Sequence, residues 1–403
     1  MRDTTHARPS VAAGSARRAW RWIGAACLGS LGLLLGCDNS PNPKGAEATN
    51  TLFVAFQERS PRHLDPTASY SLNETPYMFS VYEPPYGYHY LKRPYVVVPK
   101  AAADIAEPKY LDKDGRPLPA DAPGEQIAES VYDVHIKPGM RYAPHPAFAK
   151  DARGEYLYHA LSAADTRDKH TPFDFAQSGT REVVADDFVY AIKRHATPRI
   201  EAPIYGIFSE YVIGLKDFGQ LIRTEDRKLR GGMGAAELDK PFLDFRKYPL
   251  AGAVALDKYT YRLRIKGKYP QWKYWMTLPF TAPVPWEADK FYAQPGMAKN
   301  RLTLDVWPVG AGAFMLAEYD PDRRHVLVRN PNFHGATYPC EGAPGDKEAG
   351  LLDDCGKALP FLDKLVFNVE KDKIPLRSKF IQGYLDVPEI ERNDWGPDFL
   401  ADI

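Results

Sequence analysis

A short apolar run near the amino terminus places most of this chain outside the cytoplasm. The run covers Ile23 to Leu35, is rich in Leu, Ala and Gly, and follows Arg17, Arg18 and Arg21. Basic residues before a brief apolar core are typical of a secretory signal, and the run is shorter than the roughly 20 residues of a membrane-spanning helix. The chain is therefore expected to fold in an exported, oxidising compartment.

The apolar run ends in Leu34-Leu35-Gly36-Cys37. This ending resembles the lipobox of bacterial lipoproteins, in which the cysteine receives a diacylglycerol and becomes the first residue after cleavage. The resemblance implies that residues 1–36 are a lipoprotein signal peptide and that Cys37 anchors a periplasmic protein to the membrane. An ordinary cleaved signal with a coincidental cysteine is the alternative. Residues 37–50 are small and polar, which predicts a flexible tether.

The charge balance disfavours nucleic acid as a partner. The full chain carries 52 Lys plus Arg against 52 Asp plus Glu, and the five arginines and Asp3 of residues 1–36 sum to +4. The remainder therefore carries −4. Nucleic-acid-binding proteins show a basic stripe, and electrostatic adhesion to anionic lipid also needs positive charge. Attachment to the membrane must then come from the acyl chains.

The four cysteines predict one disulfide. Cys27 lies in the signal and Cys37 is the lipidation site, so Cys340 and Cys355 are the pair left in an oxidising compartment. Two unpaired thiols are the alternative, and a metal site is disfavoured because no second Cys or His pair accompanies them. We predict neither a metal nor a cofactor.

The hydrophobic pattern predicts an α/β fold. Strands are expected at residues 51–56, 128–137, 259–266, 326–328 and 365–369, and helices at residues 77–82 and 184–195. They follow one another without a strict βαβ rhythm, which indicates mixed sheets. The glycine-containing segment 223–240 is expected to be a solvated loop, because no strand precedes it and no Gly-Lys-Ser/Thr follows.

No local signature of an enzyme is present in the sequence. The chain lacks the short motifs of metalloproteases, α/β-hydrolases, P-loop NTPases and dinucleotide-binding enzymes. The acidic pair Asp186-Asp187 begins a predicted helix, where compensation of the helix dipole accounts for it. Five tyrosines could stack a ligand or pack at a domain junction: Tyr82, Tyr86, Tyr88, Tyr90 and Tyr95.

Five segments, in order along the chain, resemble the extracellular solute-binding proteins of family 5, the peptide- and nickel-binding lipoproteins of ABC importers. They are Leu64-Asp65-Pro66 with the later VYEPP, Arg181 to Arg194, Val254 to Ile265, Val309 to Gly335, and Phe380 to Asp386. The resemblance implies a type II periplasmic-binding-protein-like architecture with mixed sheets and two lobes that close on the ligand by hinge motion.

The resemblance also implies a domain organisation. Residues 51–98 would form the first part of lobe I, residues 99–251 an inserted small domain, and residues 252–385 the second part of lobe I. Residues 386–403 would begin a second lobe that is largely missing, because family members continue well beyond the segment that crosses to it. A chain truncated in this way is expected to bind peptide poorly.

The function implied by the resemblance is non-catalytic capture of oligopeptides or dipeptides for the ABC permease subunits in the inner membrane, by a monomer. In oligopeptide binders the backbone after the Asp-Pro turn pairs with the peptide like an added strand, and Tyr70, Ser71 and Leu72 occupy the matching positions. An ordinary loop is the alternative for this segment. For the whole chain, the alternatives are a receptor for a nickel chelate or a glycoside, a secreted hydrolase, and a signalling module.

Overall fold

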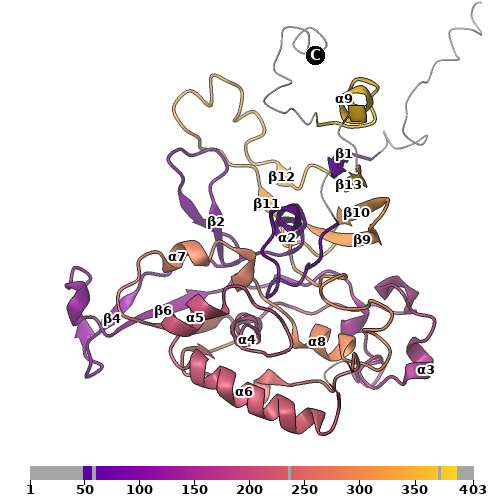
Figure 1. Ribbon diagram of the computed structural model, residues 1–403. Helices are drawn as coiled ribbons and strands as arrows, with labels where there is room; N and C mark the ends of the chain where they lie inside the picture. The colour runs from indigo at the N-terminus through magenta and orange to yellow at the C-terminus, as the bar shows by residue number, and fades with distance from the viewer. Residues whose placement is uncertain (1–48, 57–59, 235–236, 371–373, 388–403) are drawn as a thin grey trace, which may run out of the picture.

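Two larger β-sheets and the helices between them share one hydrophobic core, which runs from Phe56 to Phe367. The computed structural model describes residues 49–56, 60–234, 237–370 and 374–387, and Figure 1 shows how their elements are arranged. The predicted signal peptide, Cys37 and nearly all of the predicted tether lie outside the described residues. So do residues 388–403, which make up most of the predicted start of a second lobe.

The four-stranded sheet has the order β1-β13-β10-β9, and it is mixed because β1 pairs parallel with β13 while the other neighbours are antiparallel. Thr51 lies opposite Lys364, so strands from the two ends of the described chain are adjacent. The strands predicted at residues 51–56, 326–328 and 365–369 are confirmed. The bounds are β1 (Thr51–Phe56), β9 (Phe314–Asp320), β10 (Arg324–Arg329) and β13 (Lys364–Val369).

The five-stranded sheet is antiparallel throughout and has the order β5-β4-β6-β8-β7. Along β8 the inward side chains of Tyr261, Leu263 and Ile265 are buried and alternate with exposed or half-exposed ones, as the sequence pattern predicts. The sheet takes strands from both sides of the predicted boundary at residues 251 and 252, and the domain division stays a prediction. The bounds are β4 (Lys109–Leu111), β5 (Pro117–Leu118), β6 (Glu129–His135), β7 (Ala253–Ala255) and β8 (Thr260–Lys266).

Helix α4 lies at the centre of the molecule, between the five-stranded sheet and α6 (Figure 1). Every residue of α4 except Asp186 is buried, so both of its ends can hold ionic groups away from water. Among the described residues, no helix has both the length and the apolar character needed to cross a bilayer. The α-helices are α2 (Thr75–Val81), α3 (Ala163–Thr166), α4 (Ala185–Arg194), α5 (Tyr205–Tyr211), α6 (Leu215–Arg230), α7 (Trp272–Trp275), α8 (Trp286–Tyr292) and α9 (Ile374–Ile381).

Short 3₁₀ turns connect these elements. They are η2 (Leu72–Glu74), η3 (Gly124–Gln126), η4 (Pro146–Phe148), η5 (Pro172–Asp174), η6 (Phe245–Lys247) and η7 (Pro279–Thr281).

The expectation of a loop throughout residues 223–240 is wrong for residues 223–230, nearly half of the segment. Helix α6 continues to Arg230 and ends at Gly231, which takes a φ of 54° that favours glycine. Its mixed charges pair along the helix, Lys228 with Glu225 at 2.7 Å and Arg230 with Asp226 at 2.9 Å. Charge pairs three and four residues apart stabilise a helix, so the absence of a phosphate-binding motif did not imply a loop here.

A disulfide-closed loop stands beside a tyrosine-rich hairpin (Figure 1). The structure joins Cys340 and Cys355, the pairing that the sequence predicts, in the loop between β11 (Ala336–Thr337) and β12 (Ala358–Leu359). The hairpin consists of β2 (Tyr86–Tyr88) and β3 (Val97–Pro99). The rings of Tyr90 and Tyr338 lie 5.9 Å apart and join the two segments.

Candidate functional site

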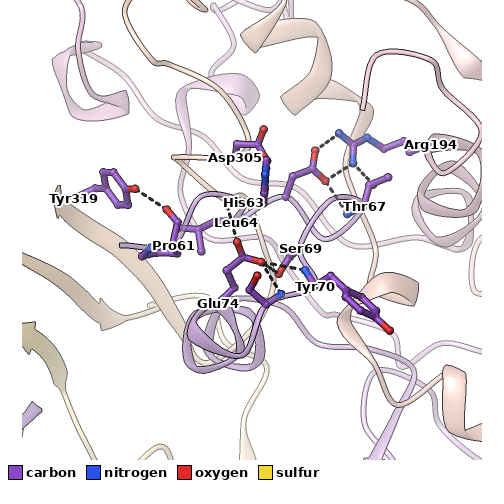
Figure 2. A network of polar contacts seen from close by, with 12 residues as sticks. Pro61, His63, Leu64, Thr67, Ser69, Tyr70, Glu74, Arg194, Asp305 and Tyr319 are labelled. Atoms are coloured by element: carbon purple, nitrogen blue, oxygen red, sulfur yellow. Dashed lines mark hydrogen bonds and ion pairs between the residues drawn. The ribbon is translucent and has the colours of Figure 1, made fainter. Parts of the chain in front are cut away.

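The predicted contact residues lie in the loop formed by residues 63–74, here called the ligand loop, which leads from β1 to α2 (Figure 2). A tight turn at Asp65 begins this loop. The Asp65 side chain accepts a hydrogen bond from the Thr67 N–H at 2.8 Å, and its carbonyl accepts from Ala68 and Ser69. Asp followed by Pro favours such a turn, because the short carboxylate can accept from the backbone two residues on.

A buried arginine attaches this turn to the helices beneath it. Arg194, the last residue of α4 and 1% exposed, donates two hydrogen bonds to the Asp65 carboxylate, each of 2.7 Å. It also donates to Asp289 of α8 at 2.9 and 3.0 Å and to the Thr67 hydroxyl at 2.5 Å. Burial alone would raise the pKa of Asp65, but the Arg194 charge and hydrogen bonds outweigh it and hold this pKa below its ordinary value.

Glu74 sets the conformation of the ligand loop. Its carboxylate is 2% exposed and accepts hydrogen bonds from the His63 N–H at 3.0 Å and the Ser69 hydroxyl at 2.8 Å (Figure 2). It also accepts from the backbone N–H groups of Tyr70 at 3.0 Å and Ser71 at 3.2 Å. One buried charge therefore satisfies four donors of a loop that has no sheet partner, as buried polar groups require.

The three predicted contact residues are brought to the surface together. Tyr70 is 68% exposed and stacks on Phe280 with ring centroids 5.9 Å apart, while Leu72 is 88% exposed. Ser71 is extended, with φ −91° and ψ 147°. Two of their three backbone N–H groups are already held by Glu74, a constraint that the sequence does not reveal. Their role in ligand binding stays a prediction.

Two glycines of the segment 309–335 let it approach the end of α2. A Cβ on Gly310 would lie 2.0 Å from the Val81 carbonyl oxygen, and one on Gly312 would lie 2.6 Å from the Ser80 carbonyl oxygen. The Gly312 N–H donates to Val81 at 2.8 Å, and the Asn330 amide donates to the Gly312 carbonyl at 2.8 Å. These contacts explain why the segment needs Gly-x-Gly: it holds the helix that follows the ligand loop.

Asp305 adds a titratable group beside the ligand loop (Figure 2). Its carboxylate lies 3.1 Å from Nδ1 of His63, and its backbone carbonyl accepts from the Leu64 N–H. Burial, and next the nearby charge of Asp65, raise the pKa of Asp305 from 3.8 to about 6. This carboxyl therefore changes charge within the mildly acidic range.

A second arginine cluster repeats the arrangement at the other end of α4. Arg181 donates to Asp187 of α4 at 2.6 and 2.7 Å and to Glu287 of α8 at 2.6 and 2.7 Å. Asp187 also accepts from the Val184 N–H at 3.0 Å. The dipole explanation for the acidic pair was thus incomplete, because Asp187 is an ion-pair partner. Both clusters hold α4 and α8 together.

A cavity of about 220 Å³ lies beneath the turn, with Asp65, Arg194, Asp289 and Asp305 in its wall. In the described part of the chain, no group of three or more His, Cys, Asp or Glu side chains is placed to hold a metal ion. The tyrosine cluster divides between two environments. Tyr82 and Tyr86 are buried, whereas Tyr88, Tyr90 and Tyr95 are exposed on the hairpin.

Comparison with known proteins identifies the family. The sequence profile of the bacterial extracellular solute-binding proteins, family 5, middle region, matches residues 177–401, which is more than half of the chain. This protein is a family 5 solute-binding protein. The resemblance stated from the sequence is confirmed, as is a fold with mixed sheets. A search of curated proteins found no match.

Several solved structures are similar to this family 5 protein. They include the murein tripeptide binding protein MppA of Escherichia coli, at 14% identity over 84% of this chain and 45% of that one, with a TM-score of 0.48. OppA of Listeria monocytogenes bound to peptide matches at 13% identity over 84% and 46%, with a TM-score of 0.48. OppA of Haemophilus influenzae in complex with RPPGFSPFR matches at 16% identity over 84% and 45%, with a TM-score of 0.46. The chain spans about half the length of these structures.

Sequence reasoning missed the residues that hold the site. Arg194 ends the helix segment that carried the family resemblance, and its charge there is explained by the helix dipole, so the sequence did not point to Asp65 as its partner. Glu74 offered no signal, since a glutamate near a helix start is usually exposed. Asp289 and Glu287 could be placed only by the fold, because α8 lies far from the ligand loop in the sequence.

Removal of the central arginine should destabilise the protein strongly. In Arg194→Ala the buried Asp65 and the partly buried Asp289 lose their countercharge, a change that typically costs about 3–5 kcal/mol. Urea unfolding of the purified chain would measure it. Arg323→Ala is the matched control, because Arg323 is 63% exposed in its ion pairs and should cost less than about 1 kcal/mol. Equal costs for the two variants would contradict this assignment.

Asp305 should make the stability depend on pH. A carboxyl whose pKa is raised by folding holds its proton more tightly in the folded state, so its contribution is full below about pH 4 and is lost as the pH rises through about 6. Asp305→Asn removes this loss. We expect the Tm of the variant to match that of the wild type at pH 4 and to exceed it at pH 7. If the Tm of Asp305→Asn and the Tm of the wild type changed in parallel between pH 4 and pH 7, the prediction would be wrong. Asp217→Asn, at an exposed position, serves as the control.

Proposed function

We propose that this protein is the substrate-binding component of an ABC importer and captures peptides in the periplasm while anchored by a lipid on Cys37. The observation that carries the proposal is the family match over residues 177–401, which includes the whole of α4 and the segment that supports α2. Family 5 consists of solute-binding proteins, so we assign binding and no catalytic step.

The ligand loop suits recognition of a peptide backbone. Glu74 and Asp65 hold the loop in one conformation through buried hydrogen bonds, which reduces the entropy lost when a ligand binds. Exposed Tyr70 and Leu72 offer apolar contact beside an extended Ser71. Pairing with backbone groups gives affinity with little preference for ligand side chains, as a receptor for varied peptides needs.

A backbone donor available to a peptide at the exposed end of this loop is the N–H of Leu72. Glu74 already holds the N–H groups of Tyr70 and Ser71. Leu72 is the first residue of η2, where N–H groups have no partner within the helix. We therefore assign the first backbone contact to Leu72.

The proposed location and partners follow from the exported, lipidated amino terminus. A lipid on Cys37 and a tether of residues 37–50 would keep the protein close to the permease subunits of the inner membrane. We propose that the protein acts there as a monomer.

Leu72→Pro tests backbone recognition while preserving the loop. Proline fits the first position of a helix, and the extended Ser71 before it suits the residue preceding a proline. The change removes one N–H donor, so affinity should fall about 5- to 20-fold, as expected for one hydrogen bond. Calorimetry with a pool of di- to pentapeptides measures the ratio of the two affinities, which does not require the unsubstituted chain to bind peptide tightly.

Leu72→Ala is the matched control for this substitution, because it shortens the side chain and keeps the N–H. Its affinity should stay within about threefold of the wild type, since backbone pairing makes little use of the side chain. Equal affinities of Leu72→Pro and the wild type would place the peptide elsewhere.

Lipidation can be tested separately by metabolic labelling with a palmitate analogue. We expect label on the wild type and on Cys27→Ser, because Cys27 lies in the cleaved signal, and none on Cys37→Ser. Label retained by Cys37→Ser would overturn the assignment of the anchor.

A further inference from the structure

A cavity of about 460 Å³ lies along α4, from Val184 to Lys193, beside the start of α8. Small-molecule sites usually have volumes of about 300–1,000 Å³. Its apolar wall is made by Val184, Val189, Tyr190 and Trp286, and the indole of Trp286 is held in place by Arg246, whose guanidinium lies 3.6 Å from the ring centroid.

Most charged groups in the wall of this cavity are already paired. Arg181 binds Asp187 and Glu287, Glu182 binds Lys258 at 2.6 Å, and Arg246 binds Asp244 at 2.8 Å. Two groups differ from these. Among the described residues, neither Asp186 nor Lys193 has an oppositely charged side chain within 4.0 Å, although both line the cavity.

Lys193 is the unusual member of this pair. It is 8% exposed, and its ammonium donates one long hydrogen bond of 3.4 Å to the Phe245 carbonyl oxygen and lies 5.9 Å from the centroid of the Phe218 ring, so neither partner carries a negative charge. An ammonium carries three donors, and a buried charge is normally paired with a countercharge. Burial lowers the pKa of Lys193, while the charges of Asp186 and Asp244 act in the opposite direction. A negatively charged group bound in the cavity would supply the countercharge that the Lys193 ammonium lacks.

The spacing of the two charges sets the size of the ligand. Asp186 and Lys193 are seven residues apart on α4, so they lie on one face about 10.5 Å apart along the axis, with Val189 and Tyr190 between them. The lysine side chain leans toward the amino end of the helix and shortens this separation. An extended chain of three residues spans about 10 Å.

We propose that this cavity binds a zwitterionic peptide of two or three residues, with its ammonium on Asp186, its carboxylate on Lys193 and its central part against Val189, Tyr190 and Trp286. The site is separate from the ligand loop and does not depend on the function proposed above. Opposite charges at the two ends and an apolar wall between them select a short peptide over a simple anion.

Calorimetry with trialanine tests the site on the full chain. The measurements use the Leu72→Pro background, in which binding at the ligand loop is reduced, and the Asp186 and Lys193 variants then report the part of the binding that belongs to the cavity. We expect trialanine to bind there, and we expect Asp186→Asn and Lys193→Gln each to weaken it at least 10-fold. Single alanine, which is too short to reach both charges, should bind at least 10-fold more weakly than trialanine. Lys216→Gln and Asp217→Asn, exposed on α6, are the matched controls and should leave binding unchanged.

Blocked peptides identify each contact. N-acetyl-trialanine lacks the ammonium, so Asp186→Asn should not weaken its binding further. Trialanine amide lacks the carboxylate, so Lys193→Gln should not weaken its binding further. Because Asp186 is exposed, its variant stays folded even if Lys193→Gln does not, and thermal unfolding verifies this. Trialanine binding that both variants leave intact, or no binding in the Leu72→Pro background, would overturn the proposal. Neither result would affect the function proposed for the ligand loop, which Leu72→Pro tests in the wild-type background.

Discussion

The buried guanidinium of Arg194 connects the ligand loop to the two helices beneath it. It lies between Asp65 of the ligand loop and Asp289 of α8, and it ends the most buried helix of the fold. A planar fork with several donors can satisfy two carboxylates at once, which the single ammonium of a lysine cannot do with the same geometry. The position of the ligand loop therefore depends on an ion pair in the core.

Helix α4 takes part in buried ion pairs at both of its ends. Arg194 at its carboxyl end and Asp187 in its first turn each join an ionic cluster, and both clusters include a carboxylate of α8. A buried ion pair is weak in net stability but strict in geometry, because a misplaced partner leaves a charge without compensation. We infer that the two clusters fix the position of α4 relative to α8. The positions of the ligand loop and of the second cavity depend on this arrangement.

The ligand loop shows how a segment without sheet partners can still be rigid. Glu74 accepts four hydrogen bonds from it, and the glycines at positions 310 and 312 let the neighbouring backbone support the end of α2. Buried groups thus hold the exposed part of the loop, Tyr70 to Leu72, in one conformation. The side chains of Tyr70 and Leu72 can therefore be substituted without disturbing the hydrogen bonds that support the loop.

The sequence alone determined the strands with clear alternation, such as β8, the helix at α4, the pairing of Cys340 with Cys355 and the family. These depend on local periodicity, on counting, or on motifs that lie within single segments. Only the tertiary structure decided the roles of Glu74, Arg194 and Asp289, because each acts through a partner that the fold brings from another part of the chain. The same limit applies to Lys193, since a lysine at a helix end reads as compensation of the dipole until its burial is known. Charge in a sequence is visible, whereas burial of that charge is a property of the packed molecule.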